Sequence, residues 1–369
     1  IRDSNVQRRY LLFAPDVPLE GFLAHDERIA AHWDGLVVGG PASVEMARSR
    51  LAAFDPWDVF AAVSTWLQLG TPPTEEILEE MTAAGEDNLA GWREAFRRMP
   101  GPVLEKLLPL AATDEAESEV LAALIYARSW HGLQDPAALK ALVEDDCVEL
   151  RRTLARVLGW GVTDTETASG MLQELVDDPE PPVARAALWT AAMLGNGEAQ
   201  EHCRELVRDG QADPFQIQTL GLLGQPADCN LLRPFLDKPE LLPVTARAIG
   251  DLGSTKAVPW LIDRHTGAED EEADEAVTAG LEILLGDLPD LGEESLQQWW
   301  PQIETPFSPS TAWLRGRERP WSQDPDDEPM ESRWLSSLRT RDRAVDWLRR
   351  EIPDGFFTAG DNMEALPGE

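Results

Sequence analysis

Apolar residues recur at helical spacing along most of the chain. The segment DERIAAHWDGLVV (26–38) has apolar residues three and four positions apart, and Gly39-Gly40-Pro41 then ends the helix. The series continues with ASVEMARSRLAAF (42–54), TEEILEEMTAAG (74–85), NLAGWREAFRRM (88–99) and PVLEKLLPLAA (102–112). No segment shows the apolar–polar alternation of a half-buried strand. The pattern therefore predicts an all-α protein.

A shorter unit repeats between residues 115 and 290. Helices are expected to end at Gly132, Gly159, Gly195, Gly224, Gly253 and Gly286, which are 27, 36, 29, 29 and 33 residues apart. A leucine precedes each of the last five glycines, an apolar helix comes before it, and a leucine-containing second helix follows. A repeated helical pair of about 30 residues is typical of an α-solenoid, in which each repeat packs on its neighbours.

The stretch VTARAIGDLGSTKAVPWLI (244–262) also resembles a glycine-rich phosphate loop. Such a loop needs GxxxxGK[ST] directly after a strand. Here the order is Gly253-Ser254-Thr255-Lys256, and a helix precedes it. The same Leu-Gly element recurs where no lysine follows. We therefore interpret Gly253 as a turn between two helices, with Leu252 and Trp260 buried on either side.

Two stretches resemble known repeats. DDPEPPVARAALWTAAMLGNGEAQEHCRELVRD and PELLPVTARAIGDLGSTKAVPWLID are similar to HEAT-like repeats of the phycobilin-lyase type. The N-terminal DERIAAHWDGLVVGGPA resembles a bacterial family of HEAT-repeat proteins without assigned activity, often encoded near type VI secretion components. These resemblances imply a right-handed solenoid of HEAT-like pairs whose second helices line one concave face. Trp189 and Gln218 depart from the small or basic residues usual in the repeat.

The chain is predicted to have three regions. Residues 1–112 form a helical N-terminal extension, 113–290 the solenoid, and 291–369 a Trp-rich C-terminal cap and tail. This last region has helices predicted at 293–303 and 330–351. Its tryptophans are Trp299, Trp300, Trp313, Trp321, Trp334 and Trp347. Arginines lie between these tryptophans, as in proteins that bind single-stranded nucleic acid by stacking its bases on aromatic side chains. Acidic residues outnumber basic residues in this region, which argues against nucleic-acid binding. We expect the indoles to pack on the last repeat; a Trp/Arg-rich protein-binding hot spot is the alternative.

Charge narrows the class of partner. The chain has 67 acidic and 32 basic residues, a net charge of −35, of which residues 101–300 contribute −23. Such a surface repels nucleic acid and anionic lipid and attracts basic proteins. No apolar run approaches the roughly 20 residues of a membrane helix. We therefore expect a cytoplasmic protein whose partner has a basic surface.

The sequence contains few residues in arrangements typical of catalysis or metal binding. The three cysteines lie in helical segments without a CxxC pair, which favours a reducing compartment, and the five histidines have no zinc spacing. The sequence contains no GxSxG motif and no Rossmann fingerprint. We predict no catalytic residue, no cofactor and no metal site, and hence no enzyme.

The second helices are expected to carry the contact residues. These are Glu201, Glu205, Arg208, Arg233, Asp263 and Arg264, together with Asp270, Glu271, Glu272 and Asp274 of EDEEADE (269–275). The acidic turns Asp145-Asp146 and Asp177-Asp178 would rim this surface and steer a basic partner. EDEEADE has two alternative interpretations. In one, its acids favour the N-terminus of the next helix. In the other, it binds Ca²⁺, although it lacks the alternating ligands of an EF-hand.

These observations predict a non-catalytic protein-binding scaffold. The family resemblance implies an immunity protein or an adaptor that binds a type VI secretion effector or component. Two alternatives remain. One is an acidic nucleic-acid mimic that inhibits a basic nuclease or DNA-binding protein. The other is a lyase-type enzyme of the HEAT-repeat class, which would need a chromophore and a phycobiliprotein partner.

Overall fold

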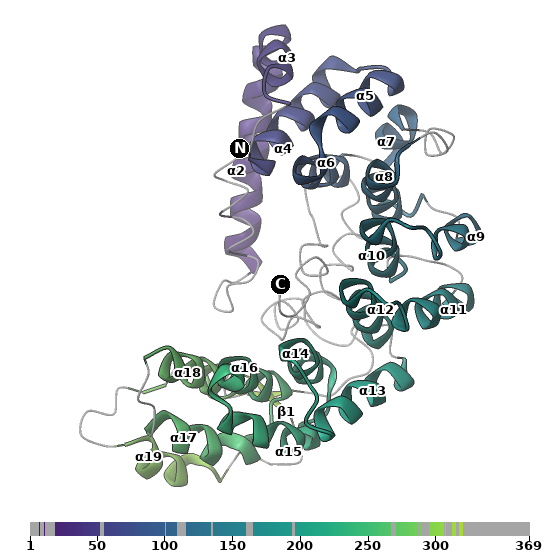
Figure 1. Ribbon diagram of the computed structural model, residues 1–369. Coiled ribbons are helices and arrows are strands. Elements are labelled where there is room, and N and C mark those ends of the chain that lie inside the picture. The colour runs from purple at the N-terminus through teal and green to yellow at the C-terminus, as the bar shows by residue number, and fades with distance from the viewer. Residues whose placement is uncertain are drawn as a thin grey trace. The chain divides into compact units, whose positions relative to one another are not determined.

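The part of the chain that the structure describes is almost entirely helical, as predicted (Figure 1). The computed structural model describes residues 7, 11, 19–51, 55–99, 101–108, 116–133, 136–159, 165–193, 196–266, 271–286, 288–289, 295–305, 307, 312–314 and 317–319. Two compact units can be distinguished, one ending at Ala191 and the other starting at Ala192. The predicted boundaries at 112 and 290 remain predictions. The predicted helix at 330–351 and Trp321, Trp334 and Trp347 lie outside the described residues.

The first unit is a succession of helices. They are α2 (Leu19–Gly39), α3 (Pro41–Arg48), α4 (Pro56–Thr65) continued by the π-helix η1 (Trp66–Gly70), α5 (Thr74–Ala84), α6 (Glu86–Arg98), α7 (Gly101–Leu107), α8 (Ser118–Trp130), α9 (Pro136–Leu139) continued by the 3-10 helix η3 (Lys140–Leu142), α10 (Val148–Val157), α11 (Thr165–Val176) and most of α12 (Pro181–Met193). Within this unit α4, α6, α8 and α10 pack side by side in sequence order.

Aromatic residues fill the core of the first unit. The indoles of Trp66 and Trp92 are buried edge to face, with ring centroids 6.1 Å apart, and Phe96 lies 5.8 Å from Trp92. At Gly91 of α6 a Cβ atom would lie 2.4 Å from the carbonyl oxygen of Pro56, so α4 and α6 meet at their backbones. This core extends from Ile29 to Ala127 and so crosses residue 112.

The second unit has more short helices. They are α13 (Gly197–Arg208), α14 (Pro214–Leu223), η4 (Pro226–Asp228), α15 (Cys229–Leu232), η5 (Arg233–Asp237), η6 (Pro239–Leu241), α16 (Leu242–Leu252), η7 (Thr255–Ala257), α17 (Val258–Thr266), α18 (Glu271–Leu285) and α19 (Leu296–Ile303). Strands β1 (Ala312–Leu314) and β2 (Arg317–Arg319) pair antiparallel, with Trp313 opposite Glu318. These three-residue strands are too short to show alternation in the sequence, and the structure agrees with the predicted all-α class.

Glycines bring the helices of one layer into backbone contact. In Figure 1, α14, α16 and α18 lie side by side, and α13, α15 and α17 form a second row. A Cβ atom at Gly221 would lie 2.6 Å from Cα of Ala248, and one at Gly250 would lie 2.6 Å from the carbonyl oxygen of Gly280. No side chain fits at these crossings, so the spacing of this layer is determined by backbone atoms.

The repeat frame of the second unit differs from the predicted one. We expected each pair to consist of the helices on either side of a Leu-Gly turn. Instead α13 packs mainly on α14 and α17 on α18, across the polar turns that join them. In the second unit the helices of a pair therefore meet across the polar turns. In the first unit α10 and α11 are in contact across the Leu158-Gly159 turn, as predicted.

Gly253 is the turn that the sequence predicted, and it has a second role. Its φ of 72° lies in the left-handed region, and it ends α16. The carbonyl oxygen of Gly253 accepts a hydrogen bond of 2.8 Å from the amide of Trp313, and a Cβ atom would lie 2.6 Å from the Trp313 oxygen. Leu252 is buried as predicted, whereas Trp260 is only half-buried.

Two C-terminal tryptophans belong to the core of the second unit. Trp300 of α19 and Trp313 of β1 are buried against the α16–α18 region. Phe307 lies between them, with ring centroids 5.4 Å from Trp300 and 4.5 Å from Trp313. The Trp-rich C-terminal cap stays a prediction.

Among the residues that the structure describes, no helix combines the length and the apolar character that a membrane span requires.

Candidate interaction surface

Six of the predicted contact residues lie in one layer of the second unit. Glu201, Glu205 and Arg208 are on α13, Arg233 is in η5, and Asp263 and Arg264 are on α17; all are exposed. Helices α14, α16 and α18 form the other layer of this unit. The concave position predicted for the contact residues stays a prediction.

The acidic segment 269–275 is largely the beginning of a helix. Asp270 lies outside the described residues, and Glu271 and Glu272 open α18. Asp274 follows in the first turn, with its Oδ1 atom 2.6 Å from Nδ1 of His265 on α17. This placement fits the alternative in which the acids favour the positive end of the helix.

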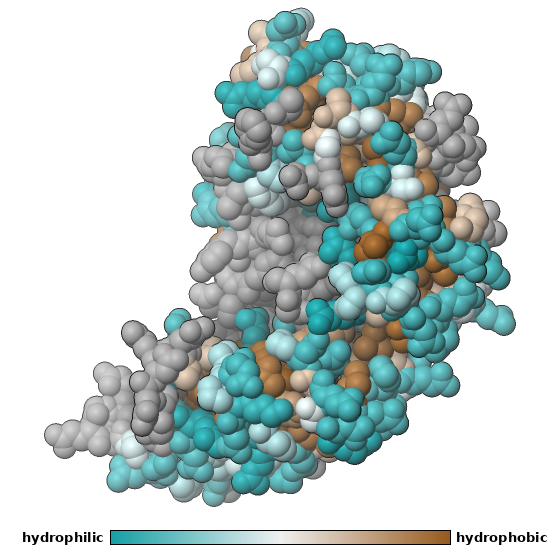
Figure 2. Space-filling view, in the orientation of Figure 1, coloured by the Kyte–Doolittle hydropathy of each residue, from teal (hydrophilic) through white to brown (hydrophobic). Residues whose placement is uncertain are grey.

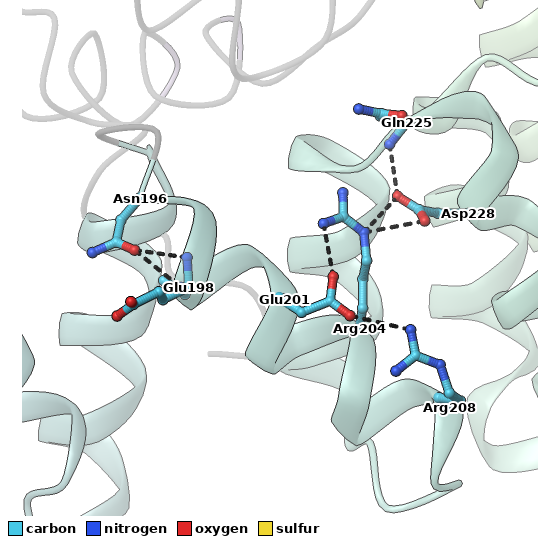
Figure 3. A network of polar contacts seen from close by, with 8 residues as sticks. Asn196, Glu198, Glu201, Arg204, Arg208, Gln225 and Asp228 are labelled. Carbon is cyan, nitrogen blue, oxygen red and sulfur yellow. Dashed lines mark hydrogen bonds and ion pairs between the residues drawn. The ribbon is translucent and has the colours of Figure 1, made fainter.

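The exposed face of α13 contains a polar network (Figure 3). Arg204 extends from α13 toward η4, and its Nε atom lies 3.2 Å from both carboxylate oxygens of Asp228. Its Nη1 atom lies 3.4 Å from Glu201, and Nη2 of Arg208 lies 3.2 Å from the other oxygen of Glu201. Asp228 also accepts a 2.8 Å hydrogen bond from the backbone amide of Gln225. The network therefore links α13 to the following repeat.

The sequence determines which face of α13 is exposed. The side chain of Asn196 accepts hydrogen bonds from the amides of Glu198 and Ala199, at 2.9 and 3.2 Å, and so starts the helix. Ala199, Cys203 and Val207 follow four residues apart and are buried. The charged residues thus lie on the outer face. The hydrogen bond from Arg208, supported by Arg204, lowers the pKa of Glu201, so this carboxyl remains ionised in mild acid.

Cation–aromatic contacts and an ion pair between side chains stabilise the surface formed by η5 and α17. The guanidinium of Arg233 lies 4.7 Å from the ring centroid of Trp260, and Nζ of Lys238 lies 4.5 Å from that of Phe235. Arg264 of α17 forms an ion pair with Asp237 of η5. Glu201, Arg208, Arg233 and Arg264 therefore have partners within the chain, which the sequence alone did not indicate.

Two acidic residues of the predicted rim, Asp145 and Asp178, accept hydrogen bonds that stabilise the turns in which they lie. Asp145 accepts a 2.8 Å hydrogen bond from the amide of Cys147, and Asp178 accepts one of 2.9 Å from Glu180. Arg151 of α10 joins the two turns: its Nε atom lies 2.7 Å from Asp178 and its Nη1 atom 2.6 Å from the Asp145 carbonyl oxygen. Their sequence neighbours Asp146 and Asp177 are exposed and available to a partner.

Replacing Asp178 should reveal its structural role. Burial opposes the ionisation of Asp178, but the hydrogen bonds from Arg151 and the Glu180 amide outweigh it and hold the pKa below its usual range. The stabilisation is therefore present above about pH 4, the unfolded pKa, and is lost as the pH falls through the lower folded pKa. At pH 7 we expect Asp178→Asn to lower the free energy of unfolding by about 2 kcal/mol.

Urea titrations from pH 7 to pH 2 measure this effect. The difference between Asp178→Asn and wild type should shrink below about pH 4. Asp177→Asn removes the exposed neighbouring charge and should change the stability by less than about 0.5 kcal/mol. Equal losses for the two variants, or a difference independent of pH, would contradict this role for Asp178.

Two cysteine thiols of the second unit are buried. Burial raises the pKa of the Cys203 thiol to about 12, and it also raises the pKa of Cys229, so neither forms a ready thiolate. Among these residues no group of three or more His, Cys, Asp or Glu side chains is placed to hold a metal ion. Figure 2 shows a mostly hydrophilic face with scattered apolar patches.

Comparison with known proteins identifies the repeat. Residues 135–218 match the family model of HEAT repeats. The match begins just before α9 and ends within α14, so it covers helices α9 to α13 and the first half of α14. The predicted HEAT-like repeat is thereby confirmed for this segment. No curated protein matches the chain. No solved structure matches it either.

Proposed function

We propose that this HEAT-like repeat protein is a non-catalytic scaffold that binds a basic protein through the exposed layer formed by α13, α15–η5 and α17. The observation that carries the proposal is the continuity of this layer. Side-chain pairs join α13 to η4, η5 to α17, and α17 to α18, so that charged groups from successive repeats are held on one rigid surface. Preorganised charged side chains lower the entropic cost of binding a partner.

Charge supports a basic partner. The net charge of −35 favours encounter with positively charged proteins. Glu205 on α13 and the exposed acids Asp146 and Asp177 in the turns supply negative groups toward solvent. In the family context that the N-terminal segment resembles, the partner is a type VI secretion effector or component. The protein then serves as an immunity protein that neutralises the effector or as an adaptor that loads it.

The test is purification from the native host with matched surface variants. Wild-type protein should recover one protein partner in stoichiometric amount, identified by mass spectrometry. We expect Glu201→Lys with Glu205→Lys to reduce recovery at least about tenfold, because two attractive contacts become repulsive. Glu79→Lys with Ala83→Lys, on exposed positions of α5, should leave it unchanged. Failure to recover any stable partner, or equal loss with both pairs, would refute the scaffold proposal.

A nucleic-acid mimic is the second candidate, favoured by the same net charge. It predicts that the partner is a nuclease or DNA-binding protein and that the complex dissociates steeply with added salt. Titrating the purified complex with NaCl and with DNA distinguishes the two. Because the scaffold also binds through charged groups, the identity of the partner decides together with the slope. A steep salt dependence with a nuclease or DNA-binding partner that DNA displaces supports the mimic, and a partner that DNA does not displace supports the scaffold.

A further inference from the structure

An open groove lies between α2, α3 and α4, at one end of the helices of the first unit (Figure 1). Its volume is about 390 Å³. Five apolar residues form its walls, namely Leu36, Met46, Ala47, Ala61 and Ala62. Beside it, at the C-terminal end of α2, Val37 and Val38 are 55% and 89% exposed. An apolar groove and a protruding pair of valines therefore form one surface, which we call the α2–α3 surface. Exposed apolar area of this kind indicates a protein-binding site.

The charged groups of the α2–α3 surface are of both signs. Arg50 and Asp58 line the groove together with His32. Residues 29–54, which supply most of the surface, contain two acidic and two basic residues, whereas the whole chain has 67 and 32. A strongly basic or strongly acidic partner would meet a charge of its own sign in the groove. The charges therefore favour a partner whose contact surface has both signs.

A second copy of the chain has such a surface. In a two-fold symmetric interface each copy presents the same residues, so the valines of one copy face the groove of the other. Asp34 is exposed and lies three and four positions before Val37 and Val38, which places it on their side of α2. A Cβ atom at Gly35 would have no neighbour within 4 Å, so another helix can approach α2 closely there.

The net charge of the chain also favours this region for contact between two copies. Two molecules with a net charge of −35 repel each other over most of their surfaces. Residues 29–54 have no net formal charge, so repulsion opposes contact least where these residues meet.

We propose that two copies of the chain associate through the α2–α3 surface as a symmetric dimer. Val37 and Val38 of each copy pack into the groove of the other, and Asp34 of each copy pairs with Arg50 of the other. The dimer covers the exposed valines of α2 twice. It uses residues of the first unit alone, so it is independent of the interaction layer on α13 to α17.

Reciprocal charge reversal tests the pairing. Sedimentation velocity of the full wild-type chain should show a species of twice the chain mass that increases with concentration. Asp34→Arg and Arg50→Asp should each raise the dimer dissociation constant at least about tenfold, because two attractive pairs become repulsive. An equimolar mixture of the two variants should dimerise again, because both pairs then join opposite charges. This recovery requires that the two residues meet across an interface between copies.

A second substitution examines the apolar contact. Val38→Asp should raise the dissociation constant at least about tenfold, because the lost burial occurs twice in a symmetric interface. Val103→Asp on α7 replaces another valine of the first unit, 40% exposed, and should leave the dissociation constant unchanged. A wild-type chain that stays monomeric, a mixture of the charge variants that does not dimerise, or equal effects of the two valine substitutions would overturn the proposal.

Discussion

Gly250→Ala should lower the free energy of unfolding of the α16–α18 region by about 3 kcal/mol. The new Cβ atom would lie 2.6 Å from the carbonyl oxygen of Gly280 and 3.2 Å from its Cα, and backbone atoms within a packed helix cannot move aside as a side chain can. Alanine favours the helical state by about 1 kcal/mol, which offsets only part of the clash. Hydrogen exchange of α16 and α18 peptides, followed by mass spectrometry, reports the local loss.

Gly170→Ala is the matched control. Gly170 lies within α11, and a Cβ atom there would have no neighbour within 4 Å. The same chemical change should therefore raise the stability of α11 by up to about 1 kcal/mol. If Gly250→Ala also stabilised its helix, the backbone contact between α16 and α18 would not be present in solution.

Trp92→Ala should cost about 4 kcal/mol, which is among the largest effects expected of any single truncation in the first unit. The indole of Trp92 is fully buried and packs against both Trp66 and Phe96. Its removal leaves a large cavity between α4 and α6, which the surrounding helices cannot close. Thermal unfolding monitored by circular dichroism should show a lower midpoint temperature for the transition of the first unit.

Trp57→Ala provides the comparison for that experiment. Trp57 is only half-buried and also contacts a phenylalanine, with ring centroids 6.3 Å from Phe60. Its truncation should cost about 1 to 2 kcal/mol, because less apolar surface is lost. Comparable shifts for the two variants would show that the Trp92 site is less tightly packed in solution than described.

The fold class was predictable because it depends on spacing. The helices predicted at 74–85 and 88–99 match α5 and α6 to within two residues, and Gly253 was correctly predicted as a turn. The ends were less accurate at the N-terminus, where α2 begins seven residues before the predicted start and α3 ends six residues before the predicted end. The pairing of helices was not predictable in the same way. It depends on Gly91, Gly221, Gly250 and Gly280, which lie inside helices and bring backbones together. A helix-interior glycine at a repeated position is the signal that could have indicated these contacts.

The candidate surface was less predictable than the fold. Exposure of Glu201, Arg208, Arg233 and Arg264 follows from helical periodicity and was anticipated. Glu201 and Arg208 pair with each other along α13. The partners of Arg233 and Arg264 lie on another element, so the sequence could not show that Trp260 and Asp237 already engage them. The sequence also directed attention to tryptophans near the C-terminus, whereas Trp66 and Trp92 form a core at the other end of the chain.

The two layers of the second unit differ in what holds them together. Helices α14, α16 and α18 meet at backbone atoms, which strongly resist compression. The row of α13, α15 and α17 is joined by ion pairs and cation–aromatic contacts, whose strength decreases with added salt. The spacing of α14, α16 and α18 should therefore stay constant as salt is added. The charged surface on α13, α15 and α17 should be most strongly preorganised at low ionic strength and should become less so as salt screens its contacts.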